Sequence, residues 1–75
     1  MVKIKDMETI KRRYAKNSLR AFLEGSQHLS WIIGVIRSSG ISGQALDEFF
    51  REFQGCGDSL RFHAAYQACR EQGWL

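Results

Sequence analysis

Four side chains of the sequence, His28, Cys56, His63 and Cys69, are of the types that bind zinc or act as nucleophiles. Six residues separate Cys56 from His63 and five separate His63 from Cys69, so the close ligand pairs of zinc sites are missing. A helix over this stretch points His63 and Cys69 in different directions and holds the two cysteines beyond disulfide reach. We therefore expect no metal, no cofactor and no disulfide, and leave a redox role open.

A catalytic role for these residues is also not expected. His63 with Asp58 or Ser59 has the residue types of a hydrolase triad, but five and four residues apart on one short helix they cannot converge. The Gly55-Cys56-Gly57 run lacks the Lys and the preceding strand of a phosphate-binding loop. We expect the protein not to be an enzyme.

Basic residues are concentrated at the start of the chain. Residues 1–20 contain seven Lys or Arg and two acidic residues, whereas residues 21–75 contain four Arg and six acidic residues. Arg12, Lys16 and Arg20 recur every four residues on the side opposite the apolar residues, with Arg13 beside them. Such a face can neutralise phosphates or steer an acidic protein toward the chain, and the pattern alone does not separate the two.

The spacing of apolar residues predicts an all-α fold, a compact bundle of four helices over about 6–24, 27–39, 43–54 and 59–72. We expect a single domain, 1–75, because the chain of 75 residues is short even for one domain. Glycines 25, 40, 55 and 73 are placed to end the helices, and the predicted N-caps are Asp6, Ser26, Ser42 and either Asp58 or Ser59.

Each predicted helix has a face that we expect to enter the core. The residues of these faces are Met7, Ile10, Tyr14, Leu19, Ala21, Phe22 and Leu23; Leu29, Ile32, Ile33 and Ile36; Ala45, Leu46, Phe49, Phe50 and Phe53; and Phe62, Ala65, Tyr66 and Cys69, with a smaller stripe of Leu60, Ala64 and Ala68. Trp31 and Val35 make the second helix apolar nearly all round. A helix of this kind is buried in the middle of a structure.

The stretch Leu29–Ser42 has part of the pattern of a DNA-binding helix-turn-helix. With Gly34 as the turn glycine, Leu29 and the small Ser30 precede it at the expected spacing. The apolar positions six and nine residues later are Gly40 and Gly43, so the pattern fails there. The helix that would read bases, 43–54, has three acidic residues and one Arg, which disfavours approach to phosphate.

Large apolar side chains exceed what so small a core can hold, which indicates an interface. We predict a homodimer and a non-catalytic regulator, inhibitor or adaptor that binds another protein through an aromatic patch and a basic helix face. The predicted contact residues are Arg12, Arg13, Lys16 and Arg20 for steering, and Trp31, Tyr66, Trp74 and Leu75 as anchors.

The alternative is a nucleic-acid-binding regulator that uses a degenerate helix-turn-helix around 29–53 or the basic face of the first helix. We expect a cytoplasmic protein without membrane contact, because the longest apolar run, 31–36, is far shorter than a membrane span. Its size and charge are similar to those of small accessory proteins of phages and mobile elements.

Overall fold

Four α-helices and their short connections make up the structure, a computed structural model that describes the backbone of residues 4–75 and the side chains of residues 9–75. The helices are α1 (Ile4–Leu23), α2 (Leu29–Ser39), α3 (Gly43–Glu52) and α4 (Ser59–Glu71). The described residues form no strand. The predicted all-α bundle is therefore confirmed.

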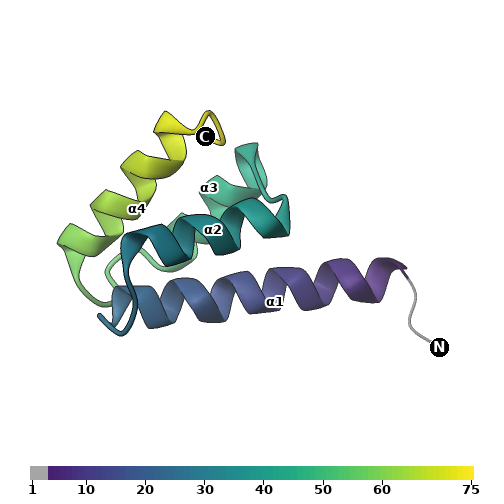
Figure 1. Ribbon diagram of the computed structural model, residues 1–75, viewed down its shortest axis with the longest axis horizontal. Coiled ribbons are helices and arrows are strands. Elements are labelled where there is room, and N and C mark those ends of the chain that lie inside the picture. Colours follow the sequence, from purple (N-terminus) through teal and green to yellow (C-terminus); the bar gives the residue numbers. More distant parts are fainter. Residues whose placement is uncertain (1–3) are drawn as a thin grey trace.

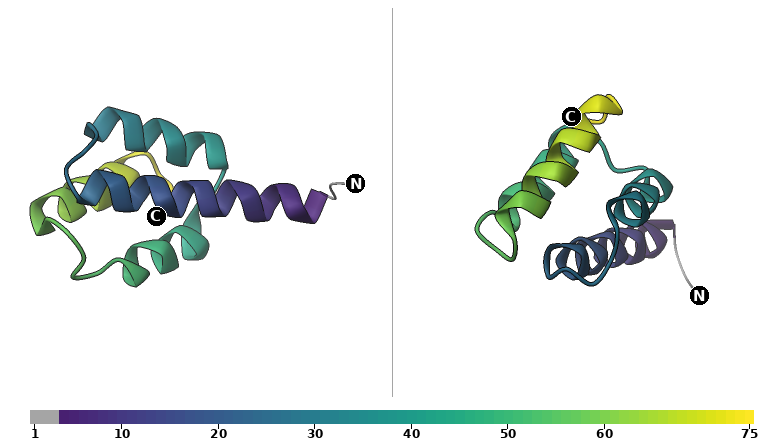
Figure 2. Two further views of the ribbon diagram at one scale, coloured as in Figure 1. Left: turned by 90° about the horizontal axis from the view of Figure 1, so that it is seen from below. Right: turned by 60° about the vertical axis from the view of Figure 1, so that its left-hand side comes forward.

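The long helix α1 is the element on which the other three are arranged (Figure 1). At 1.5 Å per residue its 20 residues span about 30 Å, more than any other helix. Helix α2 runs back antiparallel along α1, and α4 contacts both of them. Seen from below, α1 lies between α2 and α3, and its N-terminal end projects beyond the other helices (Figure 2).

Among residues 9–75, whose side chains are described, 13 apolar ones are buried in a core to which all four helices contribute. They are Ala15, Leu19, Phe22, Leu23, Ile32, Ile36, Ile41, Leu46, Phe49, Phe50, Phe53, Ala65 and Cys69. Burial of each large apolar side chain contributes about 1.5–3 kcal/mol. Among the side chains of α1 that the structure describes, the buried apolar ones begin at Ala15 and end at Leu23, in the second half of that helix.

Several side chains that the apolar spacing assigned to the core are in fact exposed. Ile10 and Tyr14 are 56% and 58% exposed, and Leu29 and Leu60 are 37% and 78% exposed. Tyr14 lies one residue from buried Ala15, which places it about 100° around the helix axis from the core face. Leu60 lies two residues from Phe62, about 200° away. On α1 the prediction was wrong because it counted Ile10 and Tyr14 in the same stripe as Phe22. Leu60 belongs to the smaller stripe of α4, which the sequence analysis had set apart from the stripe of Phe62.

The helix ends follow the predicted signals in part. The Asp58 carboxylate accepts hydrogen bonds from the Leu60 and Arg61 amides at 2.8 and 3.4 Å, which confirms it as the cap of α4. Gly40 ends α2 in the left-handed conformation, as expected. Ser26 does not cap α2, which begins after His28; its hydroxyl instead donates to the Ala21 carbonyl at 2.7 Å.

Three further boundaries differ from the predicted ones. Helix α1 begins at Ile4, before the expected cap Asp6. Helix α3 ends at Glu52, three residues before Gly55, because the turn toward α4 starts at Phe53. Ser42 occupies the N-cap position of α3 without a side-chain hydrogen bond, and the first amide of that helix, Gly43, donates to the Trp74 carbonyl.

The start of α4 is held against the end of α1 at a contact that we call the α1–α4 junction, made of Phe22, Leu23, Gly57, Asp58 and Arg61. The Asp58 amide donates to the Leu23 carbonyl at 3.1 Å. Gly57 has a φ of +65°, and a Cβ there would lie 2.6 Å from the same carbonyl oxygen. Only glycine satisfies both constraints.

Arg61 completes the junction with two more carbonyls. Its Nη1 donates to Phe22 at 3.2 Å and to Gln27 at 2.8 Å, and its guanidinium lies 5.0 Å from the Phe22 ring centre. The carbonyls of the last turn of a helix have no partner within the helix. Arg61 and the Asp58 amide therefore bind the chain at the end of α1 and fix the start of α4 there.

We predict that Gly57→Ala lowers the free energy of unfolding by about 2–4 kcal/mol, from a left-handed backbone plus a backbone clash. Gly55→Ala is the matched control, because Gly55 has a φ of +84° with nothing within 4 Å of an added Cβ. It should lose only about 1 kcal/mol. Urea denaturation measures both, and equal losses would contradict the close approach at the junction.

Candidate partner-binding surface

The predicted basic face of α1 is only partly free. Lys16 Nζ lies 3.2 Å from a carboxylate oxygen of Glu52 on α3 and 5.4 Å from the centre of the Phe49 ring. The Arg20 guanidinium lies 5.7 Å from the Phe53 ring centre. The prediction placed these residues opposite the apolar stripe, facing solvent; instead α3 packs beside them, because Lys16 is only about 100° around α1 from buried Ala15.

Between α1 and α3 lies a cleft of about 690 Å³, which we call the α1–α3 cleft. It is lined by Thr9, Arg12, Arg13, Lys16, Glu48, Phe49, Arg51 and Glu52. Cations on α1 thus face carboxylates on α3. Arg12 and Arg13 are exposed, and neither forms an ion pair with a carboxylate of the described residues. Glu8 and Arg12 are four residues apart, a spacing that allows an ion pair on a helix, but the Glu8 side chain lies outside the described ones.

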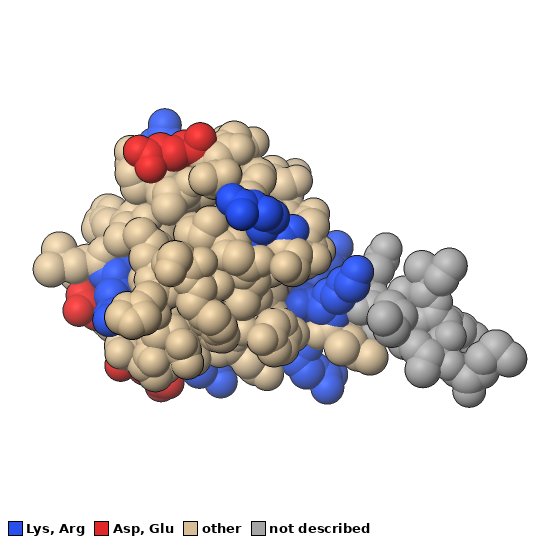
Figure 3. All heavy atoms as spheres, viewed as in Figure 1, with Lys and Arg blue, Asp and Glu red and all other residues tan. Residues whose placement is uncertain are grey.

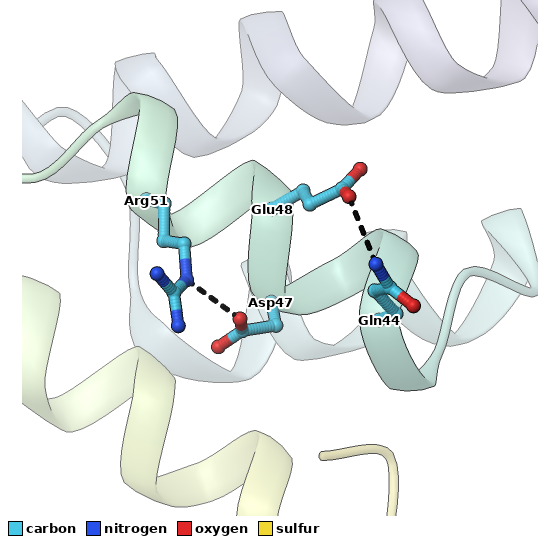
Figure 4. Close-up of polar contacts among 4 residues, drawn as sticks. All are labelled: Gln44, Asp47, Glu48 and Arg51. Carbon is cyan, nitrogen blue, oxygen red and sulfur yellow. Dashed lines mark hydrogen bonds and ion pairs between the residues drawn. The ribbon is translucent and has the colours of Figure 1, made fainter.

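Charged groups on α3 are paired largely with one another (Figure 4). Arg51 Nε donates to Asp47 at 2.8 Å, and this hydrogen bond together with the charge of Asp47 raises the pKa of Arg51 above its ordinary value. Gln44 donates to Glu48 at 3.4 Å. The exposed side of α3 keeps its acidic excess, as the sequence indicated.

An apolar groove runs between α1 and α2 on another side of the molecule. This α1–α2 groove is a cavity of about 280 Å³ lined by Ile10, Lys11, Tyr14, Val35, Ser38 and Ser39. Ile10 and Tyr14, the two α1 residues wrongly assigned to the core, form its wall together with half-buried Val35. Sequence reasoning missed the groove because it counted these residues as buried.

The predicted aromatic anchors lie at different places. Trp31 is half-buried on α2. Tyr66 packs edge-on against Phe50, with ring centres 5.4 Å apart, in the contact between α3 and α4.

Trp74 and Leu75, which were also predicted as anchors, fold back onto the core of their own domain. The Arg37 guanidinium lies 5.6 Å from the Trp74 ring centre, and the Trp74 amide donates to the Cys69 carbonyl at 3.0 Å. Both side chains are half-buried as a result.

The joint between α2 and α3 lies at residues 40–42, not at Gly34, which is inside α2. Counted from Gly40, the residues six and nine positions later are Leu46 and Phe49, and both are buried. When Gly40 is taken as the turn glycine, the two apolar residues that pack the second helix of the motif on the first are therefore present. The acidic excess of α3 remains the argument against DNA reading by this helix.

Within the described part of the chain, no three His, Cys, Asp or Glu side chains are grouped so as to hold a metal ion. Cys56 is exposed, and Cys69 is buried in the core, where burial raises the pKa of its thiol to about 11. Asp58 caps α4 and does not orient His63.

Positive charge gathers where α1 leaves the body of the bundle. In Figure 3 several Lys and Arg side chains of the visible face lie toward that end, others are spread over the rest of the face, and the acidic ones lie toward the opposite end. No helix in the described part of the chain is both long enough and apolar enough to cross a membrane.

Comparisons with protein-family models, curated proteins and solved structures found no match to this chain.

We predict that a thiol reagent modifies Cys56 rapidly in the native protein and Cys69 only after unfolding. The raised pKa of Cys69 also makes the stability pH-dependent. The thiol of the unfolded chain ionises near pH 9 and that of the native protein near pH 11. The contribution of the protonated Cys69 to the free energy of unfolding is therefore fully present below pH 9 and is lost as the pH rises from 9 to 11.

Urea denaturation of the native sequence and of Cys69→Ala at several pH values isolates this effect, because other groups titrate equally in both. The difference in free energy of unfolding between the native sequence and Cys69→Ala should become smaller as the pH rises from 9 to 11. A difference that does not change with pH would contradict a protonated buried thiol.

Proposed function

We propose that this chain is a small non-catalytic protein, a regulator, inhibitor or adaptor, that acts by binding another protein. The observation that carries the proposal is the exposure of Ile10 and Tyr14 beside Val35 on a helix rich in cations. Exposed apolar side chains that share one groove are typical of protein interfaces. Exposed Lys and Arg nearby would speed association with an acidic partner.

The placement of the basic residues of α1 opposite acidic residues of α3 also favours a protein partner. A surface that follows a nucleic-acid backbone needs cations without intervening carboxylates. In the α1–α3 cleft the cations of α1 face Glu48 and Glu52 of α3, and Lys16 is already paired. Arg12 and Arg13 are the exposed cations that would steer a partner, whereas Lys16 contacts α3 and Arg20 lies near Phe53.

A nucleic-acid-binding function is the second candidate, and one observation favours it. Lys11 and Arg12 line a small cavity with Gly40 and Ser42, at the joint between α2 and α3. Basic residues beside such a joint could contact phosphates while α3 lies in a groove of the duplex. The homodimer, the cytoplasmic location and the relation to mobile elements stay predictions.

We predict that a captured protein partner depends on the exposed cations of α1. Tagged protein is used to capture partners from nuclease-treated extracts of the source cell, and the affinity of the purified partner is then measured. Arg12→Glu with Arg13→Glu should weaken binding about ten-fold or more by reversing the steering charge. Arg70→Glu, an exposed Arg on α4, is the control and should bind normally.

The same two proteins are tested on generic duplex DNA at low salt. We expect no gel shift at micromolar protein. A shift that the double substitution abolishes, together with a partner whose affinity it does not change, would contradict the protein-binding function and support the nucleic-acid one.

A further inference from the structure

The α1–α2 groove is shaped to accept a helix. Two antiparallel helices in contact leave between them a furrow into which a third helix can pack. Tyr14 and Ile10 stand along one side of the furrow and Val35 along the other. Next to Val35, a Cβ added at Gly34 meets nothing within 4 Å, so the outer face of α2 is open to close approach there.

The surroundings of the groove determine the charge of the helix that fits it. From residue 9 to the end of α1 there are five cations, Lys11, Arg12, Arg13, Lys16 and Arg20, and no acidic residue. Of these cations Lys11 lines the groove, whereas Arg12, Arg13 and Lys16 line the α1–α3 cleft. An occupant with carboxylates beside an apolar stripe complements Lys11 and the positive charge of α1.

A second copy of this chain does not offer such a helix. Its α1 carries the same positive charges and would repel the first. Its acidic helix, α3, has its apolar residues Leu46, Phe49 and Phe50 buried in its own core, so they cannot enter a groove. The occupant that matches both the shape and the charge is therefore a segment of a different protein.

We infer that the α1–α2 groove binds an amphipathic acidic helix of a partner protein, with Ile10, Tyr14 and Val35 as the apolar contacts and Lys11 as the ionic one. This inference rests on the proposed protein-binding function and adds the site and the class of ligand. It also explains why Ile10 and Tyr14 are apolar although the fold does not bury them.

The test uses an 18-residue helical peptide of Leu, Ala and Glu with one Leu stripe, and a matched peptide in which Lys replaces every Glu. Both are titrated into ¹⁵N-labelled protein and followed by NMR. With the Glu peptide we expect saturable shifts of amides in residues 10–14 and 34–38. With the Lys peptide we expect none, because its charges repel α1.

Substitutions then assign the contacts. Ile10→Ala with Tyr14→Ala should weaken binding of the Glu peptide about ten-fold, since two exposed contacts are lost without disturbing the core. Leu60→Ala removes an exposed apolar side chain on α4 and should bind as the native protein does. Equal binding of both variants, equal binding of both peptides, or shifts confined to α3 and α4 would overturn the inference.

Two further outcomes are also decisive. Concentration-dependent shifts at the same amides without peptide, with a doubled mass in sedimentation, would show that a second copy fills the groove and would overturn the inference. Partner capture that depends on Arg12 and Arg13 but not on Ile10 and Tyr14 would also overturn it, while the proposed function would stand.

Discussion

The arrangement of this bundle depends on how the last carbonyls of α1 are satisfied. The Asp58 amide and the Arg61 guanidinium bind the Leu23, Phe22 and Gln27 carbonyls, and Gly57 lets the two backbones meet. Because the start of α4 is held there, α4 crosses the second half of α1 and contacts α2 as well. The core consequently lies over residues 15–23 of α1, and the first half of the helix extends past it (Figures 1 and 2).

The two sides of α1 then have different roles. On one side the acidic helix α3 lies close enough for Glu52 to pair with Lys16 and for Phe49 and Phe53 to lie beneath Lys16 and Arg20. Exposed pairs of this kind contribute little to stability, so their effect is mainly to occupy those cations. On the other side Ile10 and Tyr14 line a groove with Val35 that nothing in the described chain fills. A charged, partly apolar helix is thereby left available to a partner.

Local signals predicted much of this fold. Apolar spacing predicted four helices within a few residues of their bounds, because each has one face that must be buried; Gly40 and Asp58 ended and capped helices as their types require. The candidate site was less predictable. The spacing alone predicts that Tyr14 is a core residue. It is exposed because the shorter helices do not cover that part of α1, which the sequence does not reveal. Arg61 has no local signal, since its partners lie 34 and 39 residues earlier in the chain. The pairing of Lys16 likewise depends on where α3 packs.

The central claim is that α1 is divided into a half that supports the core and a half that is free to bind. Native-state amide hydrogen exchange, resolved by residue, tests it most directly. We predict that amides of residues 15–23 exchange only on global unfolding, whereas those of residues 9–14 exchange through local opening with a free energy several-fold smaller. Uniform protection along the whole of α1 would contradict the account, because it would mean that the first half is held as firmly as the core.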